Sequence, residues 1–206
     1  MKTIIISAIN FRSGGPLSIL NDCLQHLSQH WASNYRIIAL VHNKKISKPI
    51  SNIHYVPFPN STKSYVHRVF YEYFYFKKIS LQYKPDLWLS LHDISPFVIA
   101  SRQAVYCHNP APFYELSLKE ISLDPKFAIF NFFYRWVYRI NIKSNKYVIV
   151  QQEWLRKKFI KLYKLHHKNV VVAYPQTKSL QGSKSCNTKY QKQLFTNQKI
   201  KFFFPA

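Results

Sequence analysis

The sequence is poor in acidic residues, glycine and cysteine. Eight Asp and Glu stand against thirty Lys and Arg in 206 residues, a formal net charge of +22, which excludes an acidic ion-binding protein and any mechanism that needs many carboxylates. Of only three glycines, Gly14 and Gly15 are adjacent and the third, Gly182, lies far along the chain, so the dinucleotide fingerprint G-x-G-x-x-G is absent and no nicotinamide cofactor is expected. The cysteines Cys23, Cys107 and Cys186 share no short spacing, which favours reduced thiols in a cytoplasmic protein over a disulfide framework.

Long apolar runs are also missing. The N-terminal run is too short for a secretory signal and has no small-residue cleavage site after it. The most apolar later stretch, residues 127–142, is interrupted by Asn131, Arg135 and Arg139, so it falls short of the roughly 18 residues of a membrane-spanning helix. We therefore expect a chain that lies in the cytoplasm, with peripheral attachment to the inner face of the plasma membrane as a further option.

The strong positive charge has two interpretations. It is typical of proteins that bind nucleic acid, an anionic membrane surface or phosphorylated ligands. Lys, Ile, Asn, Tyr and Phe are all abundant, however, as translation of an AT-rich genome would produce. The charge alone therefore leaves a functional and a compositional origin open.

Strand-like and helix-like segments alternate along the chain, a pattern typical of βαβ units and a parallel sheet. The pattern predicts an α/β, Rossmann-like domain with helices on both faces of the sheet. Strands are expected at residues 3–9, 35–41, 53–56, 86–91, 103–107, 146–150 and 169–174, and helices at 16–31, 65–81, 127–142 and 153–163.

The composition changes after residue 175. Residues 176–198 are mostly polar and have no sustained period, which predicts a linker. Residues 199–206 are again strand-like, and a lone strand after a linker has nothing to pack against. We therefore expect one domain at 1–175 and the first strand of a second, absent domain at 199–206.

Three motifs follow strands of the predicted sheet. Gly14 and Gly15 lie between the first strand and the first helix, where free backbone N–H groups favour an anion, although a tight turn without a ligand is equally consistent. His108 and Asn109 follow the fifth strand, and Asp93 follows the fourth; His108 could bond a sugar hydroxyl or phosphate, or serve only as a turn residue.

The remaining motif candidates are weaker. Gln152 and Glu153 follow the sixth strand and open a helix, where they could equally act as helix N-terminal residues. No local spacing supports a zinc site built from His92, Cys107 and His108, so no metal is expected.

Four segments in this order resemble family-4 glycosyltransferases of the GT-B fold, especially those of bacterial O-antigen and capsule assembly. They are the Gly14-Gly15-Pro16 loop, Tyr106 to Pro110, Val148 to Trp154 and the terminal Lys201 to Ala206. Two features depart from the family: the E-x7-E element of its second domain is absent, and Gln152 stands where relatives usually carry Thr.

The resemblance implies the N-terminal, acceptor-side half of an enzyme that moves a sugar from a nucleotide-sugar donor to a lipid-linked glycan with retention of configuration. It implies that His108 and Asp93 serve catalysis and that Gly14, Gly15, Asn109, Gln152 and Glu153 bind substrate. No further cofactor is implied, and the half alone is expected to be inactive. The alternative is a basic, non-catalytic module that binds anionic lipid or RNA, although we expect no nucleic-acid partner.

Overall fold

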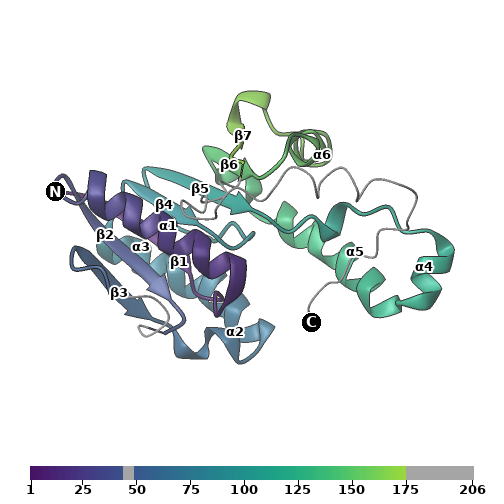
Figure 1. Cartoon of the computed structure of the whole chain (residues 1–206), viewed down its shortest axis with the longest axis horizontal. Helices are drawn as coiled ribbons and strands as arrows, with labels where there is room; N and C mark the ends of the chain where they lie inside the picture. The colour runs from purple at the N-terminus through teal and green to yellow at the C-terminus, as the bar shows by residue number, and fades with distance from the viewer. Residues whose placement is uncertain (44–48, 175–206) are drawn as a thin grey trace, which may run out of the picture. The chain divides into compact units, whose positions relative to one another are not determined.

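The structure, a computed structural model, describes residues 1–43 and 49–174. Their sheet has seven strands, all parallel, in the order β3-β2-β1-β4-β5-β6-β7. The predicted α/β fold is confirmed (Figure 1). The strands are β1 Lys2–Ala8, β2 Tyr35–Val41, β3 Ile53–Pro57, β4 Leu87–Ser90, β5 Arg102–Cys107, β6 Tyr147–Val150 and β7 Val170–Val172.

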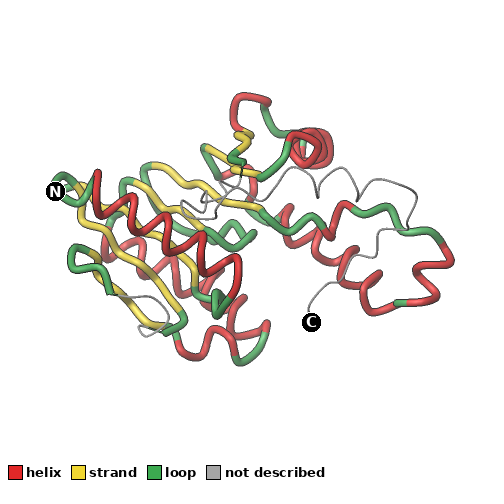
Figure 2. The backbone as a smooth tube through the Cα atoms, in the orientation of Figure 1, coloured by secondary structure: helices red, strands yellow, loops and turns green. Residues whose placement is uncertain are grey.

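Helices connect the strands, as Figure 2 shows in red. The helix expected at 65–81 is divided into α2, a π-helical turn and α3, and a short helix, α4, was not expected. A capping box in which Ser117 and Glu120 satisfy each other's backbone N–H groups holds α4. The α-helices are α1 Gly14–His30, α2 Tyr65–Phe70, α3 Phe76–Tyr83, α4 Leu118–Leu123, α5 Pro125–Arg139 and α6 Glu153–Tyr163, and the π turn is Tyr71–Tyr75.

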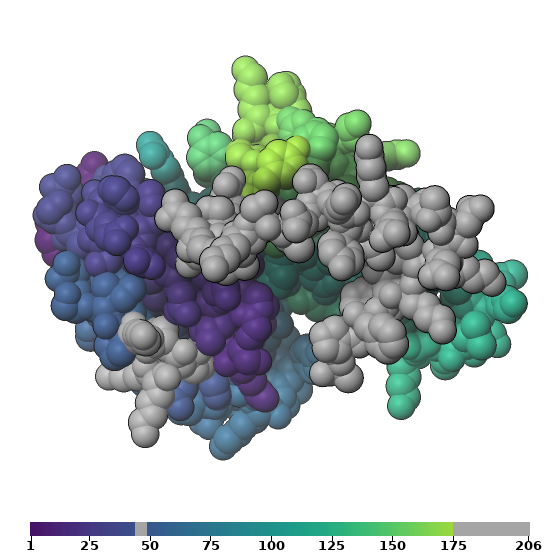
Figure 3. Space-filling model, in the orientation of Figure 1, coloured from purple at the N-terminus to yellow at the C-terminus, as the bar shows by residue number. Residues whose placement is uncertain are grey.

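Alternate residues of the strands are buried on opposite faces of the sheet. On one face Leu20 and Leu24 of α1 pack with Ile4 and Ile6 of β1, whereas Phe76 of α3 packs with the other set of strand residues on the opposite face. Elements up to α3 form one continuous mass in the space-filling view (Figure 3, purple to blue). The central strands β1 and β2 are buried on both faces, as is typical of a parallel sheet between two helix layers.

A third cluster packs α5 and α6 against β5, β6 and β7. Cys107 at the end of β5 is fully buried in it, together with Tyr138 and Phe159. Tyr106, the preceding residue, packs instead with the cluster under α1. The strand alternation therefore turns Cys107 away from the side on which its neighbour Tyr106 lies.

No helix in the described part of the chain is long and apolar enough to cross a membrane. The compact unit ends at Tyr174. The predicted linker at 176–198 and the predicted strand at 199–206 lie outside the described residues, so the domain division stays a prediction.

Candidate functional site

The strand order reverses direction at β1 and β4, which lie side by side although β2 and β3 separate them in sequence. In open parallel sheets, ligands bind at such a switch point, outside the carboxyl ends of the strands. The segments after β1, β4 and β5 meet at this edge, because the Phe11 ring contacts the rings of both His92 and His108, at centroid distances of 6.5 and 6.1 Å. The edge is the candidate site.

Asp93 fastens the segment after β4 to the segment after β5. Its Oδ1 accepts hydrogen bonds from the backbone N–H of His108 (2.8 Å), the backbone N–H of Asn109 (3.1 Å) and the hydroxyl of Tyr138 on α5 (2.8 Å). Its backbone has φ +69°, a left-handed conformation that Asp tolerates better than most residues. Asp93 is thus an anchor whose Oδ1 already has three donors.

The Tyr138 hydroxyl is a permanent donor to that carboxylate. Burial, with the charge of Asp93 as the second cause, raises the pKa of Tyr138 well above its usual value. The phenol therefore keeps its proton at any physiological pH. This bond ties α5 to the candidate site.

The His108 side chain is partly exposed, at 22%, whereas that of Asp93 is 7% exposed. Its ring stacks beside Tyr106, at a centroid distance of 5.9 Å, and lies edge-on to Phe11. Its Nδ1 is 3.5 Å from Asp93 Oδ1, beyond a good hydrogen bond, and has no hydrogen-bond partner among the described residues. The imidazole is therefore held by ring packing, with Nδ1 buried and facing Asp93. Nε2, which makes no hydrogen bond within the described residues, is the nitrogen left for a ligand.

Behind the site lies a buried polar network. His92 is fully buried, with its Nε2 3.0 Å from Ser7 Oγ of β1 and its backbone carbonyl accepting a 2.8 Å bond from Arg68. Arg68 also donates through Nε to Glu72 Oε1 at 2.8 Å, and Glu72 Oε1 lies 3.3 Å from His92 Nδ1. The network joins α2 and the π turn to β1 and β4, so it fixes the floor of the site.

Burial sets the ionisation of this network. It raises the pKa of Glu72 to about 7, against the lowering effect of Arg68. Burial, followed by the charge of Arg68, holds the pKa of His92 well below its usual value, so this ring is neutral. A neutral His92 with its two nitrogens engaged acts as a structural connector.

The two glycines lie where the first motif predicts. Helix α1 starts at Gly14, which has φ +69°, and Gly15 follows; the space where a side chain would begin is open at both. The N-cap residue Ser13 makes no side-chain capping bond. Backbone N–H groups of the first turn are thus left to water or a ligand.

The other predicted binding residues are engaged locally. Asn109 Oδ1 accepts from the backbone N–H of Ala111 at 3.0 Å. Gln152 accepts from the indole N–H of Trp154, and Glu153 pairs with Arg156 at 2.9 Å. Their roles toward a substrate stay predictions. Gln151, which the sequence did not single out, donates to the hydroxyl of Tyr106 at 2.8 Å and so faces the candidate site.

Sequence reasoning missed most of the residues that build the site's support, namely Ser7, Arg68, Glu72 and Tyr138. The Arg68 and Glu72 pair was visible as opposite charges four residues apart on a helix. Its link to His92 was not, because that contact joins segments 24 residues apart. No group of three or more His, Cys, Asp or Glu side chains suited to a metal ion occurs in the described residues.

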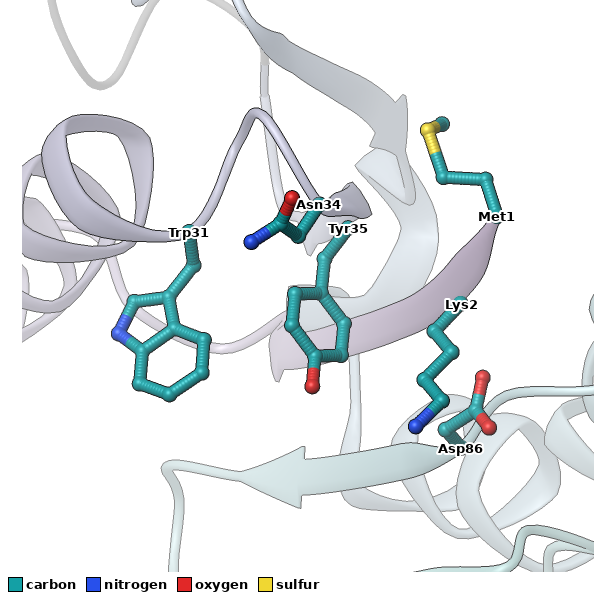
Figure 4. Close-up of a pocket in the computed structure, with 6 residues that line it drawn as sticks. All are labelled: Met1, Lys2, Trp31, Asn34, Tyr35 and Asp86. Atoms are coloured by element: carbon teal, nitrogen blue, oxygen red, sulfur yellow. The ribbon is translucent and has the colours of Figure 1, made fainter.

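Of the hollows formed by the described residues, two lie at opposite ends of the strands. One, of about 620 Å³, is at the amino ends and is lined by Trp31, Tyr35, Lys2 and Asp86, among others (Figure 4). The other, of about 400 Å³, is at the carboxyl end of β1 beside the candidate site. Only the second lies on the edge at which a parallel sheet binds ligands.

Among the comparisons with known proteins, the one with solved structures bears on the fold. No protein-family model matches the sequence, and no curated protein matches it. Among solved structures, the apo lipopolysaccharide outer core galactosyltransferase WaaB is similar at a TM-score of 0.51 and 12% identity, over 86% of this chain and 46% of WaaB. The wall teichoic acid polymerase TagF aligns at a TM-score of 0.45 and 13% identity, over 84% of this chain and 38% of TagF. This chain thus spans less than half the length of either enzyme, and its α/β fold resembles one Rossmann-like half of a GT-B glycosyltransferase.

Proposed function

We propose that the chain is the acceptor-side half of a glycosyltransferase that moves a sugar from a nucleotide-sugar donor to a lipid-linked glycan with retention of configuration. The observation that carries the proposal is the site at the switch point of a GT-B-like half, where a partly exposed imidazole packs against Phe11 of the loop that leads into α1. His108 lines the reacting sugar, and Gly14 and Gly15 approach the donor diphosphate or the acceptor. Asn109, Gln152 and Glu153 are the further candidate contacts to substrate.

The role of Asp93 in this proposal is positioning. Its Oδ1 holds the backbone of His108 and Asn109, so it sets where the imidazole lies. The third hydrogen bond to Oδ1, from the Tyr138 hydroxyl, ties the same carboxylate to α5, so Asp93 is engaged in holding three segments together. This supports a retaining, front-face reaction, which needs no carboxylate base from this half.

Residues 1–206 alone are expected to transfer no sugar. Transfer requires donor and acceptor to be held together at reacting distance, and that positioning supplies about 7–11 kcal/mol of the barrier reduction. The test compares residues 1–206 with a fusion of residues 1–174 to the second half of WaaB, using a radiolabelled nucleotide-sugar and a lipid-linked acceptor. Transfer by the fusion alone is the expected result.

Turnover by residues 1–206 above a buffer blank would contradict the need for a second half. A folded fusion that transfers no sugar would contradict the proposed glycosyltransferase function if residues 1–206 also fail to bind the acceptor. Saturation-transfer NMR with the lipid-linked acceptor measures that binding directly. Binding of RNA without binding of the acceptor would favour the basic, non-catalytic module.

The same proposal places the protein at an anionic membrane surface, and helix α5 is the element suited to it. One side of α5 packs inward through Asn131 and Tyr138, whereas its other side exposes apolar residues at helical spacing. The exposed set comprises Ile129, Phe132, Phe133 and Trp136, each between 53% and 62% exposed. Helices that are apolar on both sides are normally covered on both.

Charge favours a membrane as the cover. Between Asp124 and Glu153 the chain carries five Lys and Arg and no acidic residue. One of them, Arg139, lies over the ring of Trp136 at 5.4 Å, so a cation stands beside the largest exposed aromatic side chain. Aromatic residues flanked by cations are typical of helices that lie in the interface of an anionic bilayer.

Binding to vesicles is therefore expected to need both anionic lipid and the exposed face of α5. Phe132→Ser with Trp136→Ser should weaken binding to phosphatidylglycerol vesicles by about tenfold or more, since burying one such side chain contributes about 1.5–3 kcal/mol. Salt should weaken binding by the intact protein. Vesicle flotation measures both effects.

The matched control is Trp31→Ser with Leu162→Ser, which removes exposed apolar surface from α1 and α6 instead. It should bind as the intact protein does. Equal binding to neutral and anionic vesicles would mean that the charge reflects composition only. A dimer broken by the α5 variant would assign this face to a second copy.

A further inference from the structure

The hollow at the carboxyl end of β1 has walls from two segments far apart in sequence. Asn10 and Arg12 come from the loop after β1, whereas Thr62 and Lys63 come from the connection between β3 and α2 and Tyr65 from the start of α2. Arg12 Nη2 donates to the carbonyl of Thr62 at 2.5 Å and so joins the two walls. The hollow is thus a built feature of the fold and not a gap between unrelated side chains.

The charge of the lining is entirely positive. Arg12, Lys63 and Arg68 line the hollow and no Asp or Glu does. Within residues 1–43 and 49–174, neither Arg12 nor Lys63 has a carboxylate partner. Arg68 is only 8% exposed and is fixed from behind by Glu72 and by the carbonyl of His92. A buried, fixed guanidinium beside two free cations is suited to an oxyanion.

One uncharged group in the wall also lacks a partner. Asn10 Oδ1 is buried and accepts no hydrogen bond from the described residues. Buried polar atoms without a partner are uncommon in folded proteins, and each such atom implies a group that satisfies it. A hydroxyl next to a bound phosphate would do so.

The hollow is adjacent to the candidate sugar site. The Phe11 ring, which contacts His92 and His108, belongs to the residue between Asn10 and Arg12. Arg68 is shared by the hollow and the candidate site, since it lines the hollow and donates a hydrogen bond to the His92 carbonyl. A group bound in the hollow would therefore lie beside whatever His108 contacts.

We propose that this hollow binds the diphosphate group of a substrate, with Arg12 and Lys63 on the phosphate oxygens and Arg68 behind them. The identity of the substrate that carries the diphosphate rests on the proposed function. This substrate is either the lipid-linked acceptor or the nucleotide-sugar. The binding itself needs no sugar transfer. It can be measured on residues 1–206 as they are.

The experiment titrates inorganic pyrophosphate into isotope-labelled residues 1–206 and follows amide shifts by NMR at low ionic strength. Shifts should concentrate around residues 10–12 and 61–68. Arg12→Ala with Lys63→Ala should weaken binding by about tenfold or more, as expected for the loss of charge-assisted bonds. The matched control, Lys157→Ala with Lys161→Ala on exposed positions of α6, removes the same charge elsewhere and should leave binding unchanged.

Equal weakening by both double variants would overturn the inference, because attraction to the net charge would then explain the binding. Shifts spread over the whole surface would do the same. Farnesyl diphosphate, which resembles the lipid-linked acceptor, and UDP, which resembles the nucleotide-sugar, then separate the two sources. The compound that binds more tightly, and whose affinity falls more in the Arg12→Ala, Lys63→Ala variant, identifies the substrate whose diphosphate this hollow binds.

The outcome is distinct from that of the proposed function. One result would support the diphosphate site and contradict the proposed glycosyltransferase function. It is selective binding of pyrophosphate, together with a folded fusion that neither binds the acceptor nor transfers sugar. Sugar transfer by a fusion that carries Arg12→Ala with Lys63→Ala at an unchanged KM for the acceptor and for the donor would keep the enzyme and remove this inference.

Discussion

His108→Ala in the fusion of residues 1–174 to the second half of WaaB is expected to lower turnover about a hundredfold, the lower end of the effect of a positioned polar group at a reacting centre. The free energy of unfolding should fall by about 1 kcal/mol or less. His108 has no hydrogen-bond partner at Nδ1, so its removal leaves no buried partner stranded; the loss is limited to its ring contacts with Phe11 and Tyr106. Initial rates and thermal unfolding measure the two effects.

Two matched variants separate chemistry from packing. His108→Phe keeps an aromatic ring between Phe11 and Tyr106 but removes both nitrogens, so it should be as inactive as His108→Ala and more stable. Cys107→Ser, at the neighbouring and fully buried position, exchanges a thiol that lies 3.8 Å from the Asp93 carbonyl for a more polar hydroxyl within an apolar cluster, and should lower stability by about 1 kcal/mol while it spares turnover. Full turnover by His108→Phe would remove His108 from the reaction.

Arg68→Met is expected to lower the free energy of unfolding by about 3–5 kcal/mol, the usual result of removing one partner of a buried ion pair. Glu72 is fully buried, its Oε1 accepts from Arg68 at 2.8 Å, and its Oε2 has no partner among the described residues. Without the guanidinium, the carboxylate is stranded in the floor of the site. Urea unfolding measures the loss.

The loss should depend on pH in a defined direction. The pKa of Glu72 is raised in the folded protein, to about 7 from 4.5, so the folded state binds this proton more tightly than the unfolded state does. Stability linked to Glu72 is therefore full below pH 4.5 and is lost as the pH rises through 7. Arg68→Met removes an interaction that favours the carboxylate, so its cost should be larger at pH 8 than at pH 5.

A double variant tests whether the buried charge of Glu72 causes the loss of stability. Arg68→Met with Glu72→Gln removes the stranded charge and should recover much of the stability at pH 8. Lys158→Met, which breaks the exposed pair with Glu115, should leave stability unchanged. An Arg68→Met cost that does not vary with pH would mean that lost packing, and not the buried carboxylate, causes the effect.

The order of elements was readable from the sequence because it rests on local patterns. Continuous runs of β-branched residues such as Ile4 to Ile6 can be buried on both faces only in a parallel sheet with helices above and below, and all seven strands lie where these runs predicted them. The alternation along β5 likewise placed Cys107 in the core. The π turn that divides residues 65–83 was not predicted. It contains Glu72, whose carboxylate contacts His92 from a distant segment, and no local sequence pattern encodes such a contact.

The sequence by itself thus determined the α/β class, the strands and the edge on which polar residues gather, since hydrophobic periodicity and the handedness of βαβ connections depend on neighbours along the chain. Only the tertiary structure decided the parts those residues play. Asp93 was a candidate catalytic residue by position, and its catalytic role stays a prediction; the fold adds three hydrogen-bond donors from other segments to its Oδ1, which no local pattern encodes. Arg68 looked like one cation among thirty, yet it joins a buried network to a positively charged hollow. Such roles are set by burial and by hydrogen-bond partners dozens of residues away, and these exist only once the chain has folded.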